Sequence, residues 1–461
     1  MTGLDLSNSG NLSTLTKNRK RHSAAFLNLP DCVVSMKQKS AIPPSCSVII
    51  LCHSDKRDGK RTSGSGPIEP LIAFFTAQRA RYIFVIEQPH PMPDISLDCT
   101  MEVYRDGCRI ATHASDRFRW LYNIPSHRRV MRTYLRLKAR DIIASRDLLA
   151  LIPKHYPDAS PVHLVIGMES VNTLVGQSFR KALSVRSVVY YTFDWAPQRY
   201  RNKVMSAAFN WLDKRACARA DVCWNVTDAI AEARRDLLHY DMSKMARQLT
   251  VHYGVEFRKN LVKPYEELEK FKVIFSGGHH IDNGAQFLPE IARHLYAADP
   301  RIRLIITGGG TLTDELKRRV REDGLGNVTF TGFIESPEDL DRLTCECVIG
   351  LAPYPDTDVS TKKYGDVIKI RHAFACGLAV VSTHVPPASK EISEEGLGIV
   401  TGVDAREMAD AILKLCSDEA LLKNCREAAI RKAKSHNWAS IYARAVSETL
   451  EHRQTASAAL R

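Results

Sequence analysis

Lys369 and Arg371 are the two cations of this sequence whose setting suggests an anionic ligand. They stand where a helix is predicted to begin, over 371–376, and Gly377 would end that helix. A cation beside a helix N-terminus is unfavourable for the helix dipole, and a shared anion such as a diphosphate would offset that cost. The alternative is that each side chain points into solvent.

Two glycine-rich segments follow predicted strands. The segment 276–278 (Ser-Gly-Gly) ends the strand predicted over 272–275, and 308–310 (Gly-Gly-Gly) ends the strand over 303–307. Glycine lets the backbone pass close to a phosphate, and the helix N-terminus that follows offers free N–H groups. Glycines at strand ends also serve tight turns that bind nothing. Neither segment has the spacing of a dinucleotide fingerprint or a P-loop.

Asp194 follows a strand predicted over 187–192 and precedes Trp-Ala-Pro. A carboxylate in this position can accept the proton of an attacking hydroxyl. It can equally cap the next turn of the chain, and its position alone leaves both roles open.

The elements that must position these residues form two runs of alternating strands and helices. The first run has predicted strands over 47–52, 82–86, 162–166 and 187–192, with helices over 70–78, about 126–152 and 202–220. The second has predicted strands over 272–275, 303–307, 328–331, 348–352 and 380–383, with helices over 286–297, 313–322 and 371–376. This alternation predicts an α/β protein with parallel sheets, in two Rossmann-like domains facing one another across a cleft. Such sheets bind ligands at the carboxyl ends of their strands, where the candidate residues stand.

Length and composition are those of a globular protein with more than one domain: 461 residues, 44% apolar and 25% charged. Residues 1–45, rich in Ser, Asn, Lys and Pro, are predicted to form a disordered basic tail. No apolar run reaches the ~18 residues that span a bilayer, and the N-terminus lacks the apolar region of a secretory signal. The twelve cysteines are scattered without zinc-site spacing, which favours a reducing compartment. We therefore expect a cytoplasmic protein.

The formal net charge of +13 is concentrated in the first half of the chain, where residues 1–250 hold 37 Lys and Arg against 22 Asp and Glu. A basic half can favour an anionic membrane surface, a polyanionic acceptor or nucleic acid. The ordinary alternative is a solvated helix face. Nucleic-acid binding is disfavoured, because the basic residues are not interleaved with aromatic ones in a binding motif.

Several segments, in their order and spacing, resemble glycosyltransferase family 4 (group 1) over about 182–453. In the second half they are Val-Thr-Phe-Thr-Gly at 328–332, Leu-Ala-Pro-Tyr at 351–354, Tyr-Gly-Asp at 364–366, Lys-Ile at 369–370, Ala-Cys-Gly-Leu-Ala-Val-Val at 375–381 and Glu-Ile at 391–392. Elsewhere they are Tyr-Thr-Phe-Asp-Trp-Ala-Pro-Gln-Arg at 191–199, Trp-Asn-Val-Thr at 224–227, Val-His-Tyr-Gly-Val at 251–255 and Asn-Trp at 437–438. The version at 364–381 is similar to that found in bacterial polysaccharide clusters.

The resemblance implies the GT-B fold and a nucleotide-sugar held without a metal or other cofactor, because positive side chains and helix ends carry the diphosphate charge. It implies an acceptor-binding domain over 46–258, a nucleotide-sugar-binding domain over 259–435, a helix over 436–453 that returns to the first domain, and a tail over 454–461. Lys369 would contact the diphosphate or base, and Asp194 would lie on the acceptor side, where an Asp acts as general base in inverting relatives. The resemblance leaves open whether the enzyme is retaining or inverting. The expected donor-binding residues are Gly277, Gly278, His279, Gly309, Tyr354, Asp366, Lys369, Arg371 and His372.

Two departures from the family pattern concern the donor. His372 stands where the family commonly has an acidic residue that contacts the ribose hydroxyls, and an imidazole is not an equivalent acceptor. The Lys that often follows the first strand of the donor domain is missing from 277–284, where Asp282 and Asn283 stand near its place. The residues that could compensate are Arg371, Lys362 and Lys363, with His279 and His280 as further candidates whose alternative is a surface turn.

We therefore expect a transferase that moves a sugar from a nucleotide-sugar to a glycan or polyprenyl-phosphate-linked acceptor in bacterial polysaccharide biosynthesis. The basic first half would dock it on the inner face of the plasma membrane. The two departures support a second hypothesis, a catalytically inactive relative that binds a nucleotide or glycan. A GT-B epimerase that uses the same pocket is a third.

Overall fold

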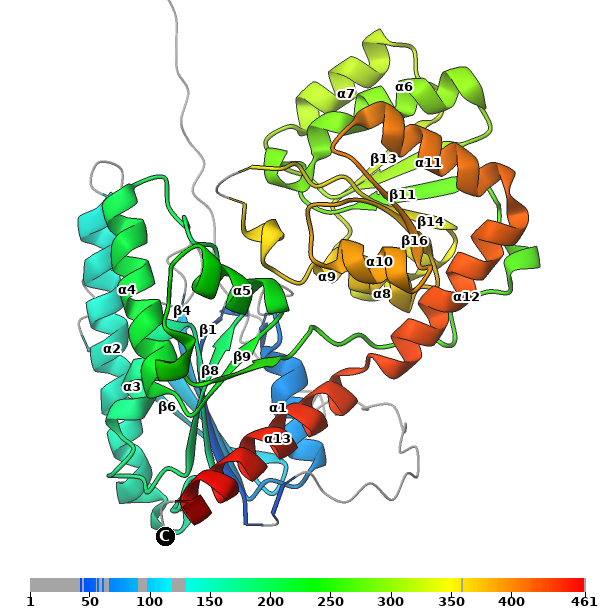
Figure 1. Cartoon of the computed structure of the whole chain (residues 1–461). Helices are drawn as coiled ribbons and strands as arrows, with labels where there is room; N and C mark the ends of the chain where they lie inside the picture. The colour runs from blue at the N-terminus through cyan, green and yellow to red at the C-terminus, as the bar shows by residue number, and fades with distance from the viewer. Residues whose placement is uncertain are drawn as a thin grey trace, which may run out of the picture. The chain divides into compact units, whose positions relative to one another are not determined.

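The computed structural model describes residues 42–43, 45–54, 56–57, 60–61, 66–89, 98–117, 130–357 and 360–459. Almost all of the predicted tail over 1–45 therefore lies outside the described residues, as do residues 460–461. Two large sheets flanked by helices dominate the described part of the chain (Figure 1), and a two-stranded sheet accompanies them.

The first sheet has eight strands in the order β10-β9-β8-β7-β1-β4-β5-β6. These strands are β1 (Ser47–Ser54), β4 (Tyr82–Pro89), β5 (Cys99–Arg105), β6 (Cys108–Ser115), β7 (Leu164–Met168), β8 (Ser187–Thr192), β9 (Val222–Asn225) and β10 (Arg247–Thr250). The flanking helices are α1 (Ile68–Ala77), α2 (Val130–His155), α3 (Ser170–Ser178), α4 (Lys203–Arg219) and α5 (Asp228–Asp236). Strands from β10 to β4 pair parallel, whereas β5 pairs antiparallel with both β4 and β6. The short strands β2 (Lys56–Arg57) and β3 (Lys60–Arg61) pair with each other.

The second sheet has six parallel strands in the order β13-β12-β11-β14-β15-β16. These strands are β11 (Lys272–Ser276), β12 (Arg303–Thr307), β13 (Val328–Gly332), β14 (Ile349–Ala352), β15 (Ala379–Thr383) and β16 (Gly398–Thr401). The helices are α6 (Leu288–Ala298), α7 (Thr313–Glu322), α8 (Pro337–Cys345), α9 (Ile368–Ala375), α10 (Ala388–Glu394), α11 (Ala405–Ser417), α12 (Glu419–Ser435) and α13 (Trp438–Ala459). The central strands are buried apolar runs, as strands covered by helices on both faces must be. The predicted α/β architecture with two parallel-rich sheets is confirmed.

The antiparallel hairpin of β5 and β6 was missing from the sequence prediction. Strand β6 is mostly exposed and polar, so it lacks the apolar run that marks a buried strand. The turn between the strands is Asp106-Gly107, and both residues have a positive φ, 49° and 87°. Asp-Gly in this conformation is a strong hairpin signal, and it could have identified the pair.

Helix α9 begins at Ile368, whereas the sequence analysis predicted a start at Arg371. Lys369 and Arg371 therefore lie in its first turn and not before it. Gly377, with φ of 73°, follows the helix in the left-handed conformation that glycine adopts without strain.

Helix α13 carries the end of the chain to the first sheet. Tyr442 is fully buried there, and its hydroxyl donates to the carbonyl of Pro67, which precedes α1. Trp224 of β9 donates from Nε1 to Thr449 Oγ1 over 3.0 Å. The helix lies beside α1 (Figure 1) and continues to Ala459, past the predicted end at residue 453.

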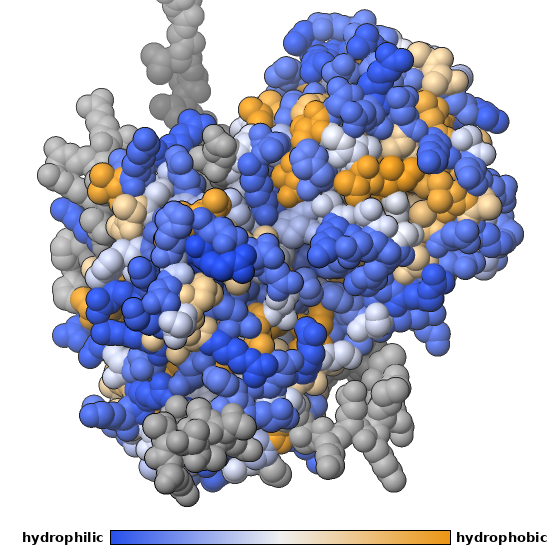
Figure 2. Space-filling view, in the orientation of Figure 1, coloured by the Kyte–Doolittle hydropathy of each residue, from blue (hydrophilic) through white to orange (hydrophobic). Residues whose placement is uncertain are grey.

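No helix within the described ranges is long and apolar enough to cross a bilayer. On the face seen in Figure 2, hydrophilic residues predominate and hydrophobic residues form smaller patches.

A fully buried ion pair joins helices α4 and α5 to the first sheet. The guanidinium of Arg234 donates to both carboxylate oxygens of Asp213, at 2.7 and 3.0 Å, and to Asn225 Oδ1 at 2.8 Å. Asp213 also accepts from the Tyr190 hydroxyl at 2.7 Å. Neither charged side chain is exposed, so each depends on the other for neutralisation.

Arg234→Met is expected to lower the free energy of unfolding by about 3–5 kcal/mol, because Asp213 is left as an unpaired buried charge. Urea unfolding measures this loss. The double variant Asp213→Leu with Arg234→Met should recover a large part of it. A single-variant loss of less than about 1 kcal/mol would show that the pair is not needed to hold the two helices.

Candidate functional site

A cavity of about 520 Å³ lies at the carboxyl ends of β7 and β8. Glu169 follows β7 and Asp194 follows β8, so the strand-end rule predicts this location. The second half of the chain contributes Tyr354, which follows β14, and the segment 361–369, which leads into α9. An adjoining hollow of about 460 Å³ shares Asp194, Arg199, Thr361 and Lys362 with the cavity and reaches His280, Asp282 and Asn283.

Lys369 places an ammonium group at the wall of this cavity in apolar surroundings. Its Nζ lies 5.3 Å from the ring centre of Phe275 and 5.9 Å from that of Tyr354. Among the described residues Nζ has no hydrogen-bond partner, although the atom is buried. Burial, together with the charge of Lys362, lowers the pKa of Lys369 to about 7. A buried cation without a partner is a ready site for an anion.

Gly277 gives this ammonium its space. A Cβ at position 277 would lie 2.0 Å from Lys369 Nζ and 2.2 Å from Cε, and the φ of Gly277 is 148°. A Cβ at Gly308 would lie 2.1 Å from the carbonyl oxygen of Gly277. The two glycine-rich strand ends therefore pack directly on one another and bring backbone against the Lys369 side chain.

His279 lies beneath these strand ends. It is 1% exposed, its Nδ1 is 2.9 Å from Thr313 Oγ1, and its ring packs near those of Phe275 and Phe330. Its backbone N–H donates to the carbonyl of Gly309, whose own Cα faces open space. Burial lowers the pKa of His279, so it is neutral near pH 7.

Asp194 is paired with Arg199. The guanidinium of Arg199 donates both to the Asp194 carboxylate and to its backbone carbonyl. Burial opposes the carboxylate charge, but the hydrogen bond and charge of Arg199 and the charge of Lys362 lower the pKa of Asp194 overall. The side chain is 50% exposed. Asp194 is therefore an ionised carboxylate at the cavity wall, held in place by a cation.

Arg371 and Asp366, both predicted to bind the donor, form an internal ion pair. Arg371 Nε donates to Asp366 at 2.9 Å, and its two terminal nitrogens donate to Glu391 at 2.6 and 2.9 Å. Asp366 also accepts from the backbone N–H of Tyr253 at 2.8 Å. The charge of Arg371 at the start of α9 is thus offset by two carboxylates of the protein and not by a ligand. Asp366 still lines the cavity, while Arg371 is 1% exposed.

His372 contacts α8, although it also lines a small hollow together with Lys369. Its Nε2 lies 2.7 Å from Asp341 Oδ1 and 3.6 Å from Cys376 Sγ. Of the compensating cations considered above, Lys362 lines both hollows, whereas Lys363 is paired with Asp356.

Glu169 is a candidate that sequence reasoning missed. It combines φ of 71° with ψ of 163°, a region that residues other than glycine rarely occupy. Its carboxylate lies 3.9 Å from Lys138 Nζ and is 36% exposed at the cavity. The predicted strand over 162–166 stopped short of it, since Gly167 interrupts the apolar run. Strained residues of this kind concentrate at functional sites.

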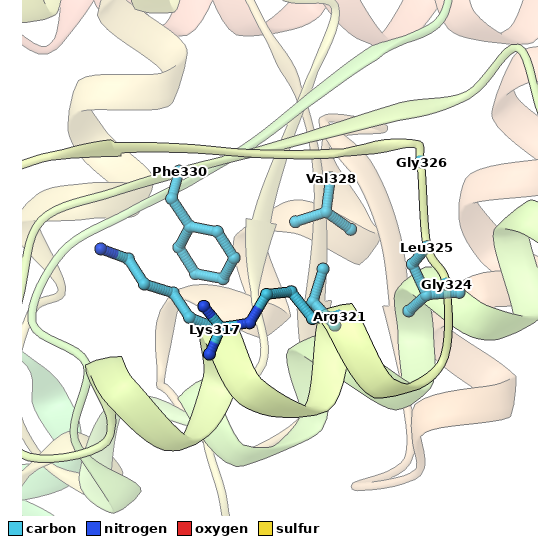
Figure 3. Close-up of a pocket in the computed structure, with 8 residues that line it drawn as sticks. Lys317, Arg321, Gly324, Leu325, Gly326, Val328 and Phe330 are labelled. Atoms are coloured by element: carbon cyan, nitrogen blue, oxygen red, sulfur yellow. The ribbon is translucent and has the colours of Figure 1, made fainter.

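A separate hollow of about 430 Å³ lies between α7 and the edge strand β13 (Figure 3). Lys317 and Arg321 of α7 line it together with Val328 and Phe330 of β13, and Lys317 Nζ lies 5.9 Å from the Phe330 ring centre. None of the predicted site residues lines it, so the cavity around Lys369 is the better candidate.

Lys369→Met is expected to raise the melting temperature of the ligand-free protein more at pH 6.5 than at pH 10. The folded-state pKa of about 7 lies below the ordinary value of 10.5, so the cost of burying the charge is complete below pH 7 and disappears as pH rises to 10.5. Thermal melts at both values measure the difference. The exposed Lys390→Met serves as the control, and an equal shift at both values for Lys369→Met would contradict a buried charged lysine.

Comparison with known proteins adds a family to this geometry. Residues 270–418 match the family described as Glycosyl transferases group 1. Chitobiosyldiphosphodolichol beta-mannosyltransferase of Kluyveromyces lactis is 26% identical over 149 residues, which is 32% of this chain and 32% of that protein. The chain thus aligns with about a third of the length of this curated relative.

Solved structures resemble nearly the whole chain. HepE of Anabaena in complex with UDP is 17% identical, with a TM-score of 0.56, and the likeness covers 88% of this chain and 99% of that one. The α,α-trehalose 6-phosphate synthase of Burkholderia multivorans is 13% identical, with a TM-score of 0.62, and the likeness covers 90% of this chain and 98% of that one. The sucrose-phosphate synthase of Thermosynechococcus elongatus is 16% identical, with a TM-score of 0.59, and the likeness covers 89% of this chain and 100% of that one. The predicted GT-B fold is confirmed by these likenesses, and the predicted resemblance to group 1 is confirmed over the matched residues. The chain therefore has the GT-B fold, and residues 270–418 in its second half are similar to group 1 glycosyl transferases.

Proposed function

We propose that this protein transfers a sugar from a nucleotide-sugar, with UDP as the nucleotide, to a glycan or polyprenyl-phosphate-linked acceptor. The observation that carries the proposal is Lys369, whose buried and unpartnered ammonium lies against Gly277 at the cavity. A diphosphate would supply the missing negative charge. The group 1 match over 270–418 supports a nucleotide-sugar, and the complexes of HepE with UDP and with UDP-glucose support UDP.

The donor would be held by cations and by backbone at the strand ends. Lys369 takes the diphosphate, and Lys362 and Arg199 add positive charge along the adjoining hollow in place of the missing family Lys. Gly277, Gly278 and Gly309 follow the ends of β11 and β12 without lining either hollow, and they would let the backbone approach a donor that extends toward these strand ends. Tyr354 forms part of the cavity wall. Arg371 and Asp366 act indirectly, since their ion pair fixes the first turn of α9 and with it Lys369.

Proton removal from the acceptor is assigned to Asp194. It is ionised and exposed to the cavity, as a general base must be. Its pairing with Arg199 reduces its basicity. Glu169 is the competing candidate, because it lines the same cavity and is partly exposed, whereas Asp366 is buried in its ion pair with Arg371.

The acceptor and the place of action are inferred from charge. The first half holds the excess of positive charge, which suits a phosphate-linked acceptor at the inner face of the plasma membrane. The name of the Kluyveromyces relative includes a diphosphodolichol-linked sugar, which supports a lipid-linked acceptor. The resemblance of 364–381 to sequences from bacterial polysaccharide clusters favours polysaccharide biosynthesis in the cytoplasm.

A catalytically inactive, nucleotide-binding relative is the second candidate. The observation that favours it is His372, which replaces the acidic ribose contact and is turned toward Asp341.

Gly277→Ala is expected to weaken UDP binding at least about 10-fold, because the added methyl group would force Lys369 out of its position. Isothermal titration calorimetry with UDP measures the change. Gly396→Ala is the matched control, since Gly396 also has a positive φ, 64°, but has open space around it. Equal affinity for UDP in the Gly277→Ala variant and the wild type would sink the proposed donor position.

Asp194→Asn is expected to lower turnover by about 10²-fold or more with little change in the Kd for UDP. The assay is UDP release from UDP-glucose, UDP-galactose and UDP-N-acetylglucosamine with undecaprenyl-diphosphate-linked sugars. Asp410→Asn, an exposed carboxylate of α11 that lines neither hollow, is the control.

The same assay on Glu169→Gln separates the two carboxylates. Turnover that survives Asp194→Asn but is lost in Glu169→Gln would move the general base to Glu169. Saturable UDP binding without turnover of any donor, GDP-sugars included, would favour the inactive relative.

A further inference from the structure

Four side chains with the donor atoms that zinc prefers converge where α8 faces α9. Asp341 and Cys345 belong to α8, and His372 and Cys376 belong to the end of α9. Ligand atoms of Asp341, His372 and Cys376 all lie within 4.8 Å of one another. Cys345 of α8 is the nearest further thiol and interacts with Cys376, although its Sγ is not within 4.8 Å of all three of these atoms, so its side chain would have to turn toward the ion.

The spacing of these residues suits chelation by two helices. Asp341 and Cys345 are four residues apart, as are His372 and Cys376, and this spacing puts both members of each pair on one helix face. The two pairs face each other through the contact of His372 Nε2 with Asp341 Oδ1. Asp341, Cys345 and Cys376 are at least nine-tenths buried.

Two distances among Asp341, His372 and Cys376 can be compared with those of a tetrahedral ion. Zinc ligands lie at about 2.1 Å for nitrogen and about 2.3 Å for sulfur, so two such ligands at a tetrahedral angle are about 3.6 Å apart. Cys376 Sγ and His372 Nε2 are 3.6 Å apart. The hydrogen-bonded pair of His372 and Asp341, now at 2.7 Å, would open by less than about 1 Å to admit the ion.

Charge also balances at this place. Two thiolates and one carboxylate exceed the charge of Zn²⁺ by one negative unit. Arg258 Nε lies 2.7 Å from Asp341 Oδ2, the oxygen that does not face His372, and supplies the compensating positive charge. A cation or hydrogen-bond donor that orients a ligating carboxylate in this way is usual at zinc sites.

We propose that Asp341, Cys345, His372 and Cys376 form a structural Zn²⁺ site that ties α8 to α9. Four protein ligands make the site closed, so the ion stabilises the fold and does not activate a substrate. Helix α9 carries Lys369 in its first turn, and the ion therefore fixes the helix that positions this lysine. The proposal does not rest on the proposed function and does not place a metal at the donor diphosphate.

The test is zinc binding by the full chain, reduced and stripped with EDTA. We expect one Zn²⁺ per chain by elemental mass spectrometry after reconstitution, and a melting temperature that rises with added ZnCl₂. Cobalt substitution should give the thiolate-to-metal absorption of a tetrahedral site. No zinc bound above the background of an EDTA-treated control, with no shift in melting temperature, would overturn the proposal.

Variants assign the ligands. His372→Ala and Cys376→Ser should each weaken Zn²⁺ binding by at least about 100-fold in competition with a chromophoric chelator, since even an outer partner contributes about 10- to 100-fold. Cys347→Ser is the matched control, because its buried thiol contacts the Leu343 carbonyl. Asp341→Asn provides a further ligand variant if either of the first two does not fold. Unchanged Zn²⁺ affinity in the ligand variants would contradict the site. A purified protein that holds a Cys345–Cys376 disulfide, and that binds no Zn²⁺ once this disulfide is reduced, would contradict it as well.

Discussion

The amino group of Lys369 lies in surroundings that oppose its charge, and the architecture of the candidate site depends on this conflict. The faces of the Phe275 and Tyr354 rings attract the ammonium group but replace only part of the hydration that it loses on burial. Gly277 leaves room for it where any side chain would collide. Burial without a partner lowers its pKa to about 7, so near neutral pH the group changes readily between its two forms. An anion in the cavity would stabilise the charged form, and this makes the site responsive to its ligand.

Arg371, two positions farther along the same helix, differs from Lys369 because its charge has partners within the protein. Its charge is neutralised within the protein by Asp366 and Glu391, which hold the pKa of the guanidinium above its usual value. Asp366 also accepts from the backbone of Tyr253, so the network connects α9 to the segment that joins the two sheets. One cation of the turn thus fixes the helix, and its neighbour is left for a ligand. The zinc site would hold the other end of the same helix.

Much of the fold could be predicted from the sequence, because buried parallel strands appear as continuous apolar runs that alternate with amphipathic helices. The strands over 187–192 and 303–307 were predicted with the bounds that the structure has. The hairpin of β5 and β6 was not, because an exposed edge strand carries no apolar signal. Of the site, the strand ends and Lys369 could be predicted, because both depend on local spacing. The partners of Arg371 and the strain at Glu169 could not, because they depend on residues distant in the chain and on backbone angles.

The measurement that tests the central claim most directly is the number of protons taken up when UDP binds. Isothermal titration calorimetry at pH 8, in two buffers of different ionisation enthalpy, gives this number. A diphosphate beside Lys369 raises a pKa that starts at about 7, so the wild type should take up close to one proton, and Lys369→Met none. Binding of UDP without proton uptake, or with the same uptake in Lys369→Met, would contradict the claim that Lys369 receives the donor.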